Sequence, residues 1–205
     1  APRDLLQGLG VYVVGAASAS PADQVLVIDD RETGEARLVV LAVPYLRDRD
    51  IRVAQPGESL EDKERHLVEG IRHHYRRVFE AAEMKRAALD RTVPMIATGH
   101  LFAAGAVTAE GDGVRNLYIG TLAQVQGDVF PPGLDYLALG HLHVPQSVGG
   151  TQTIRYSGSP LPMGFGEAGQ QKCVLSIDLS SGHPEVAVVP VPVFQRLETL
   201  RGDWD

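Results

Sequence analysis

Apolar and polar residues alternate along the chain in short blocks that predict strands. Short runs of aliphatic and β-branched residues, bounded by Gly, Pro, Asp or Ser, are typical of strands in a buried sheet. By this criterion we expect strands at 11–14, 25–28, 37–43, 93–98, 136–139, 153–156, 173–179 and 185–191. The polar segment 30–35 contains Gly34 and should join the strands on either side of it as an antiparallel hairpin.

One long segment follows a helical period instead. Ser59 stands before it as an N-cap, and Asp62 lies three residues further on, which is an acidic variant of the capping box. Apolar residues then recur at helical spacing, so they share one face of the helix. The residues of this face are Leu60, Leu67, Ile71, Tyr75, Val78 and Ala82. Because the other face is rich in Glu and Arg, the helix should pack on the sheet by one side only.

The order of these elements predicts an α/β fold with a mixed sheet. The first strands are joined by a hairpin and should be antiparallel, whereas the strands after the helix are joined by longer connections. Polar residues with the chemistry of a site follow the strands at 93–98 and 136–139. In α/β sheets, ligand sites lie at the carboxyl ends of strands.

Composition places the chain among ordinary globular domains. It has 205 residues, of which 44% are hydrophobic and 22% charged, and no apolar run has the length of a membrane span. We expect a cytoplasmic protein. The net charge of -7 argues against a protein that coats DNA by a general positive field, but not against an enzyme that meets phosphates through metal ions. The single cysteine, Cys173, lies in a predicted strand and should be a buried, inert thiol.

Two predicted strands end in Gly followed by His. Gly99-His100 follows one strand, and Gly140-His141-Leu142-His143 follows another. Extended backbone aims residues i and i+2 the same way, so His141 and His143 should point together, and His100 should join them at the same edge. Three imidazoles at one edge predict a metal site. The alternative is that each histidine is a polar residue at a strand end, satisfied by a neighbouring carbonyl group.

The long helix carries two further groups of interest. His66, Glu69 and His73 fall on neighbouring turns, where they form either a metal site or simply a solvated helix face. Five arginines form a local basic cluster, for which phosphate contact and ion pairing at the surface are the two interpretations. They are Arg72, Arg76, Arg77, Arg86 and Arg91. His183 lies in a predicted turn and should be a surface residue.

The histidine motifs resemble those of a known family. Gly99-His100, the segment 135–143 and the segment 155–162, with its Ser157-Gly158-Ser159-Pro160 run, are similar to the second half of calcineurin-like metallophosphoesterases. Segments 43–47 and 105–115 extend the similarity toward the SbcD branch of this superfamily, which contains nuclease subunits. The resemblance implies an α/β fold that is part of a two-sheet sandwich with mixed sheets and flanking helices.

The resemblance also implies a cofactor and its ligands. The complete enzyme would hold two Mn²⁺ ions, with His100 and His141 on one ion and His143 on the other. Ser157 and Ser159 would shape a phosphate pocket, or else belong to a simple turn. The other ligand motifs of the family, Asp-x-His, Gly-Asp-x-x-Asp and Gly-Asn-His-Asp, do not occur in this sequence. We therefore expect no catalytic residue in this chain, and weak metal binding or none.

The same comparison predicts domain limits. Residues 1–197 would form the C-terminal half of a calcineurin-like nuclease domain, and residues 198–205 would begin the linker to a capping domain. Half a sandwich would leave open sheet edges, so we also expect a homodimer.

The activity expected of the full-length protein is that of a metal-dependent exonuclease and endonuclease. It would act on double-stranded DNA ends in repair and recombination, together with an SbcC-like ATPase subunit. We expect no membrane as a partner. The chain alone would be inactive. The alternatives are a degenerate binding module without catalysis and a nucleotide phosphodiesterase of the same superfamily.

Overall fold

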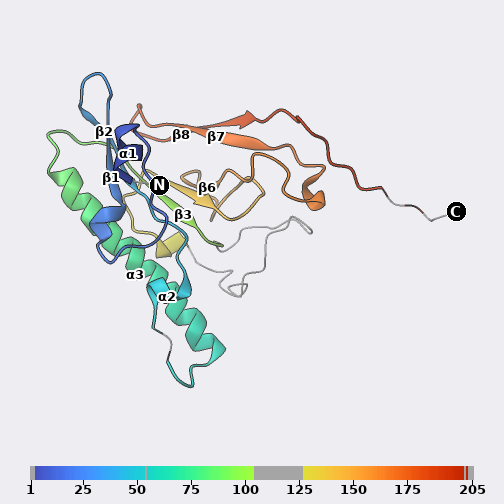
Figure 1. The fold of residues 1–205 in the computed structure, drawn as a ribbon, viewed down its shortest axis with the longest axis horizontal. Coiled ribbons are helices and arrows are strands. Elements are labelled where there is room, and N and C mark those ends of the chain that lie inside the picture. Colours follow the sequence, from blue (N-terminus) through green and yellow to red (C-terminus); the bar gives the residue numbers. More distant parts are fainter. Residues whose placement is uncertain (1–2, 54, 104–126, 201, 203–205) are drawn as a thin grey trace.

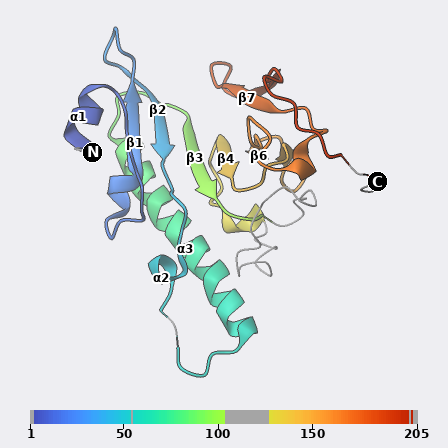
Figure 2. The same ribbon diagram turned by 45° about the vertical axis from the view of Figure 1, so that its right-hand side comes forward.

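A six-stranded sheet forms the centre of the molecule. The structure is a computed structural model and describes residues 3–53, 55–103, 127–200 and 202. Within these ranges the strand order is β1-β2-β3-β4-β6-β5, and Figure 2 shows the first five of these side by side. The strands are β1 (Val25–Asp29), β2 (Ala36–Leu41), β3 (Met95–His100), β4 (Tyr136–Gly140), β5 (Gln146–Ser147) and β6 (Ile154–Tyr156).

The sheet is mixed, as the sequence predicts. β1 and β2 form the expected antiparallel hairpin, whereas β2, β3, β4 and β6 run parallel to one another, and β5 runs antiparallel to β6. The hairpin turn is held by Asp30, whose Oδ1 accepts hydrogen bonds from the backbone N–H groups of Glu32 and Thr33 at 2.9 and 3.0 Å. Gly34 has a φ of 72°, a conformation that glycine adopts without strain.

Helix α3 (Leu60–Ala87) covers one face of the sheet (Figure 1). Ser59 is its N-cap, as expected, and its Oγ accepts from the N–H of Asp62 at 3.1 Å. The helix buries the predicted apolar face except for the first residue of that face, Leu60, which is 77% exposed. Its buried residues are Leu67, Ile71, Tyr75, Val78 and Ala82. Four of them, Ile71, Tyr75, Val78 and Ala82, join alternate residues of β2 and β3 in the hydrophobic core.

A second, two-stranded sheet is formed by β7 (Cys173–Asp178) and β8 (Glu185–Pro190), which pair antiparallel. In Figure 1 this hairpin lies on the side of the six-stranded sheet opposite α3. Cys173 is buried, as predicted, but β8 is mostly exposed. The α/β fold with mixed strands, a second sheet and a flanking helix therefore agrees with the fold expected from the sequence.

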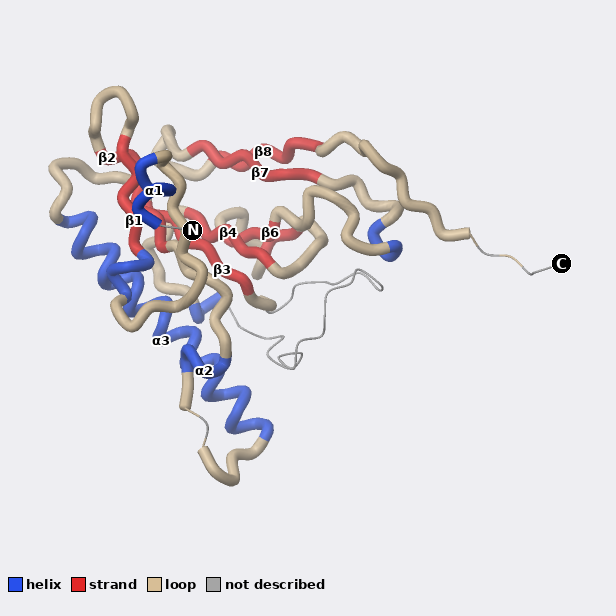
Figure 3. Tube along the Cα trace, in the orientation of Figure 1, coloured by secondary structure: helices blue, strands red, loops and turns tan. Residues whose placement is uncertain are grey.

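Short helical segments complete the described chain, and Figure 3 shows them among the loops. They are α1 (Arg3–Gly8), η1 (Pro21–Gln24), α2 (Asp48–Ile51), η2 (Gly127–Val129) and η3 (Phe165–Glu167). In the part of the chain that the structure describes, no helix is long and apolar enough to span a membrane.

One local expectation was wrong. Residues 11–14 form no strand, and Val11, Tyr12 and Val13 are about half exposed. Their β-branched composition favours extended backbone, but a strand also needs a hydrogen-bonded neighbour, and these residues pair with none of the described strands. The charged segment after β2 contains α2. Arg47 precedes this helix and its backbone N–H and guanidinium both bond Asp50.

Candidate metal centre

The two strand-Gly-His segments meet at one edge of the sheet. β3 and β4 are parallel neighbours, and His100 pairs in register with Gly140. The imidazole rings of His100 and His141 consequently lie with their centroids 5.1 Å apart. The Tyr45 ring, from the segment after β2, packs edge-on against His100 at 5.7 Å. The structure thus brings His100 and His141 together at the carboxyl ends of adjacent parallel strands.

Each glycine before a histidine lies where a side chain would be crowded. A Cβ at Gly99 would overlap the Tyr75 hydroxyl and would lie 3.0 Å from Leu139 Cδ2. A Cβ at Gly140 would lie 3.1 Å from Nδ1 of His100. The backbones of β3 and β4 can approach the helix and each other's histidines because these positions carry no side chain.

The backbone turns sharply just after β4, at the first of the two histidines. The strand ends at Gly140, and His141 has a φ of 104°, the one positive φ among the described non-glycine residues. Leu142 then points into the core with 2% of its surface exposed. The extended backbone expected between His141 and His143 is therefore absent, and the joint direction of their side chains stays a prediction. Unfavourable φ values of this kind concentrate at functional sites, where the surrounding structure enforces them.

His143 is held by a different set of residues. Its Nδ1 lies 2.8 Å from Oε1 of Glu167, and its carbonyl oxygen accepts from the N–H of Ser159 at 3.2 Å. Glu167 itself has no exposed surface. Burial raises the pKa of the Glu167 carboxyl, but hydrogen bonds from Lys172, His143 and Ser159 outweigh burial and hold the pKa below its usual value.

The electrostatics favour neutral imidazole at His100. Its partial burial lowers the pKa of the ring, and the nearby His143 lowers it further. Neutral imidazole is the form that binds metal ions. The segment after His100 is fixed by the buried Tyr156, whose hydroxyl donates to the Leu101 carbonyl at 2.7 Å and accepts from the N–H of Ala103 at 3.0 Å. Burial raises the pKa of Tyr156 to about 12, although the Ala103 hydrogen bond opposes the rise, so its hydroxyl stays protonated.

The described residues supply part of a ligand set. Two imidazoles facing each other suit a transition-metal ion. However, no group of three or more His, Cys, Asp or Glu side chains within residues 3–53, 55–103, 127–200 and 202 is arranged to hold a metal. This result includes the possible helix site, in which the ring of His66 instead bonds Glu58 at 2.6 Å. His100, His141 and His143 fit as imidazole ligands, but a complete site would need carboxylates in addition.

The two serines of the predicted phosphate pocket differ in their surroundings. The hydroxyl of Ser159 is buried, donates to Oε2 of Glu167 at 2.9 Å and accepts from Nζ of Lys172 at 3.0 Å. Ser157 is partly buried and its hydroxyl lies 3.4 Å from the Gly158 carbonyl oxygen. The Ser157–Pro160 run is therefore more than a simple turn, and its role toward phosphate stays a prediction.

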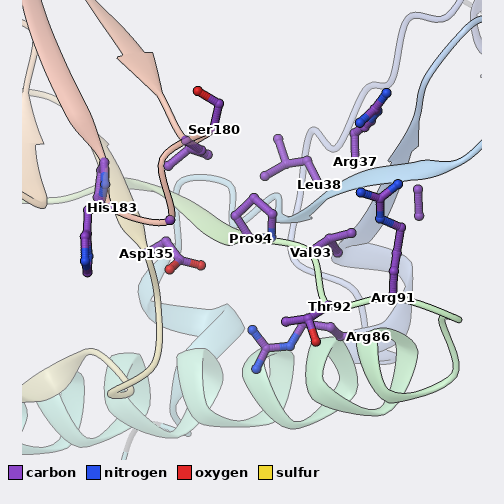
Figure 4. Close-up of a pocket in the computed structure, with 14 residues that line it drawn as sticks. Arg37, Leu38, Arg86, Arg91, Thr92, Val93, Pro94, Asp135, Ser180 and His183 are labelled. Carbon is purple, nitrogen blue, oxygen red and sulfur yellow. The ribbon is translucent and has the colours of Figure 1, made fainter.

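A cavity of about 590 Å³ lies at the opposite edge of the sheet (Figure 4). Pro94 and Asp135, which immediately precede β3 and β4, line it together with Arg86, Arg91 and exposed His183. Its position at the amino ends of the parallel strands is not where ligand sites of such sheets lie. Its arginines are paired with carboxylates, namely Arg37 with Asp30, Arg86 with Glu83 and Arg91 with Glu35. This supports the interpretation of the basic cluster as ion-paired surface.

Sequence reasoning missed Glu167 and Lys172. Both lie in the segment between β6 and β7, which reads as an irregular polar loop, and charged residues in such loops are normally exposed. Their spacing carries no periodic signal. The one available clue is Lys172 immediately before the apolar run of β7, where a buried charge would need a partner. The segment 105–115, which contributes to the family resemblance, lies outside the described residues.

Comparison with known proteins gives a consistent result. No family model matches the sequence. The chain is 41% identical to the SbcD subunit of the nuclease SbcCD from Escherichia coli K12 over 202 residues, which are 98% of this chain and 48% of that protein. It is 38% identical to the protein of the same name from Rhodobacter capsulatus over 199 residues, 94% of this chain and 47% of that protein. With the Bacillus subtilis protein of that name it shares 31% identity over 175 residues, 84% of this chain and 41% of that protein.

The mixed six-stranded sheet, the second two-stranded sheet and the flanking helix form an α/β fold that is consistent with the metallophosphoesterase type. Within that class, the chain is a homologue of the SbcD subunit of the nuclease SbcCD over nearly its whole length. It spans about half the length of the curated relatives it matches.

Proposed function

We propose that the whole protein to which this chain belongs is a metal-dependent nuclease. It cleaves double-stranded DNA at ends, as exonuclease and endonuclease, and acts in DNA repair and recombination. The observation that carries this proposal is the meeting of His100 and His141 at the carboxyl edge of the sheet, in a chain 41% identical to a nuclease subunit. Imidazoles at that position are suited to bind a metal ion that polarises a phosphodiester.

The proposed cofactor is a pair of Mn²⁺ ions. His100 and His141 would hold one ion and His143 the other, and the ions would supply an activated water and neutralise charge on phosphate oxygens. The chain's own contribution is to present these imidazoles in the neutral form, which the lowered pKa of His100 supports. Ser157 precedes Gly158 and Ser159, which approach the His143 carbonyl oxygen, and would contact the phosphate. The hydroxyl of Ser159 is already engaged with Glu167 and would act indirectly.

We infer that this chain alone is inactive and binds metal weakly. Within its described ranges, no carboxylate completes the histidine group, and the sequence lacks the family's Asp and Asn motifs. Histidines without a bridging carboxylate hold Mn²⁺ poorly, since this ion has low intrinsic affinity and prefers oxygen ligands.

The proposed partners are double-stranded DNA ends and an SbcC-like ATPase subunit, which the name of the relatives supports. We also propose a homodimer and a cytoplasmic location. The net charge of -7 means that contact with DNA must depend on bound ions and local groups and not on a general positive field.

The test is Mn²⁺-dependent degradation of linear double-stranded DNA by the whole protein with its ATPase partner. His141→Ala should lower the rate at least about 100-fold, because an ion held at one position by fewer ligands no longer stabilises the reacting phosphate. His183→Ala is the matched control, since His183 is exposed at the opposite edge of the sheet and should leave the rate unchanged. Activity of the His141 variant equal to wild type would refute the proposal.

Two other outcomes distinguish the alternatives. Hydrolysis of small nucleotide phosphodiesters, with linear DNA left intact, would favour a nucleotide phosphodiesterase. The absence of a three-residue metal group among the described residues favours the degenerate binding module as second candidate. For that module, the whole protein would bind DNA or its ATPase partner with equal affinity in wild-type and His141→Ala forms and would hydrolyse neither substrate.

A further inference from the structure

A fully buried carboxylate stands behind His143. Glu167 has no exposed surface, and its Oε2 accepts from the ammonium group of Lys172, from the Ser159 hydroxyl at 2.9 Å and from the N–H of Met163 at 3.3 Å. Its other oxygen, Oε1, lies 2.8 Å from Nδ1 of His143. Lys172 is itself only 3% exposed. Ser159, Met163, Glu167 and Lys172 all lie between β6 and β7, whereas His143 lies between β4 and β5.

Stability alone is a poor explanation of this group. Moving a carboxylate and an ammonium out of water costs several kcal/mol for each ion, and apolar residues of similar volume often stabilise a protein equally well or better. What a buried pair provides is a fixed geometry, because every lone pair and proton needs a partner in a defined direction. Here one of the partners of Glu167 is the ring of His143.

His143 is fixed at its backbone as well as at its ring. Its carbonyl oxygen accepts from Nζ of Lys172 and from the N–H of Ser159, both at 3.2 Å. Gly158 permits this approach, since a Cβ there would lie 2.6 Å from the same oxygen, and its φ is 78°. Nζ of Lys172 thus donates both to Glu167 and to the His143 carbonyl oxygen. Ser159 donates to Glu167 through its hydroxyl and to the His143 carbonyl oxygen through its backbone N–H. The ring and the backbone of His143 are therefore positioned by one network.

The contacts of Glu167 select one form of the His143 ring. With Lys172 on Oε2, Glu167 is a carboxylate, and a carboxylate oxygen can only accept. Nδ1 of His143 must therefore carry the proton, which leaves the lone pair on Nε2, at the far side of the ring. A ring nitrogen binds a metal ion through its lone pair, and the group that holds the other nitrogen fixes both tautomer and orientation.

We propose that Glu167 is a positioning residue that holds His143 as the Nδ1-protonated tautomer, with Nε2 as its ligating nitrogen. This inference rests on the proposed function for the identity of the ion, whereas the tautomer itself is a property of the protein without metal. Lys172 extends the network to the second sheet, since it immediately precedes β7 and its carbonyl accepts from the N–H of Val191, just after β8, at 2.8 Å. This bond connects the β7–β8 hairpin to the network that holds His143.

The decisive variant is Glu167→Gln in the whole protein. Lys172, Ser159 and the Met163 N–H all require an acceptor, so the amide oxygen should take the place of Oε2 and the NH₂ group should face Nδ1. A donor in that position reverses the tautomer of His143. We expect NMR of ¹⁵N-histidine-labelled, metal-free protein to show Nδ1 protonated in wild type and Nε2 protonated in the variant. The His143 signals are assigned by their loss in His143→Ala.

Metal affinity provides the second measurement. Loss of a partner behind a metal-binding histidine typically weakens binding about 10- to 100-fold, and we expect that decrease in Mn²⁺ affinity, measured from free Mn²⁺ by electron paramagnetic resonance. Glu80→Gln is the matched control, because Glu80 is exposed on α3 and the change in charge and shape is identical. It should leave both the tautomer and the affinity as in wild type.

A double variant separates positioning from folding. Glu167→Gln leaves Lys172 buried without its carboxylate and so risks unfolding, whereas Glu167→Gln combined with Lys172→Met leaves no buried unpaired charge. If Glu167 positions His143, the double variant folds but keeps the reversed tautomer and the weakened Mn²⁺ affinity. An unchanged tautomer in the single variant, or wild-type affinity in the folded double variant, would overturn the proposal.

The outcome also separates this inference from the proposed function. If His143→Ala leaves the Mn²⁺ affinity unchanged while Glu167→Gln reverses the tautomer, the positioning of the ring is supported and the metal assignment of His143 is refuted. DNA cleavage by the whole protein plays no part in either measurement, so a failure of the nuclease proposal would not be mistaken for a failure of this one.

Discussion

Gly99 and Tyr75 share a small volume next to the candidate metal centre. Tyr75 is fully buried on α3, and its hydroxyl donates to the carbonyl of Thr98 at 2.9 Å, one residue before Gly99. Burial raises the pKa of Tyr75, so this hydroxyl stays a donor at any ordinary pH. The hydrogen bond fixes the distance between the helix and β3. At position 99 it leaves room for a hydrogen atom but not for a side chain.

Gly99→Ala should therefore destabilise the protein by about 1–3 kcal/mol, the usual effect of an added methyl group in a filled core. The new Cβ would overlap the Tyr75 hydroxyl and press on Leu139 Cδ2. Chemical denaturation of the two proteins measures the difference in unfolding free energy. The control is Gly169→Ala, whose Cβ would meet nothing within 4 Å, and which should stay within about 0.5 kcal/mol of wild type. Equal effects of the two substitutions would contradict this explanation.

At the level of single residues, the sequence predicts the histidines but not what holds them. His100 and His141 are predictable because the strand-Gly-His pattern occurs twice and parallel neighbours end at one edge. Glu167 is not, since its burial results from contacts with residues of several loops, none of which has a local pattern. The φ of His141 is equally invisible in the sequence, because non-glycine residues seldom adopt positive φ.

Among the elements, α3 is the one that the sequence predicts most completely. Its N-cap residue, its apolar face and its polar face all predict the same helix. The structure places this helix at Leu60–Ala87 with Ser59 as its N-cap. Leu60 departs from the pattern because it stands in the first turn, beyond the reach of the sheet, and is left in solvent. Residues 11–14 depart from theirs for a comparable reason, since strand formation depends on a neighbour that a local pattern cannot reveal.

Ser59→Ala should lower the unfolding free energy by about 1 kcal/mol. The substitution removes the acceptor for the N–H of Asp62 and the hydroxyl that donates to the Asp62 carboxylate at 2.7 Å. Thermal denaturation followed by circular dichroism measures the effect. Ser59→Thr keeps the hydroxyl and should retain most of the stability. A loss as large for Thr as for Ala would show that the cap is not the cause.

For the whole molecule, the β7–β8 hairpin is the least complete part. A two-stranded sheet is marginal by itself, and this one exposes Val188 at 56% and Val189 at 45% of their surfaces. Its strands also leave backbone groups open to pairing, which is how sheet edges associate. The chain spans about half the length of its relatives, so we expect these surfaces to make contacts between copies when the chain is produced alone.

Light scattering should accordingly show a mass that rises with concentration toward a dimer. Val188→Lys should shift this association to higher concentration by placing a charge on the exposed hairpin. Val53→Lys is the control, because Val53 is 79% exposed and lies in the loop after α2, away from the hairpin. A monomer of constant mass over a wide range of concentration, or equal effects of the two substitutions, would contradict the prediction.

The architecture at this scale is only partly predictable. Local patterns predict the strands and the mixed α/β class, but not the order β1-β2-β3-β4-β6-β5 or the separation of β7 and β8 into a second sheet. Strand order depends on pairing between segments far apart in the chain, such as β3 and β4, whose contacts leave no periodic trace in either segment. The resemblance to metallophosphoesterases predicts the second sheet, but not the strand order.

The close approach of Gly99 and Tyr75 has a consequence for how related sequences diverge. Because the two positions share one volume, position 99 can carry a side chain only if the residue at position 75 becomes smaller, and the Thr98 carbonyl would then lose its donor. Substitutions at the two positions should therefore arise in pairs or not at all. In an alignment of relatives they should form a coupled pair, although position 75 lies on a helix and position 99 follows on a strand.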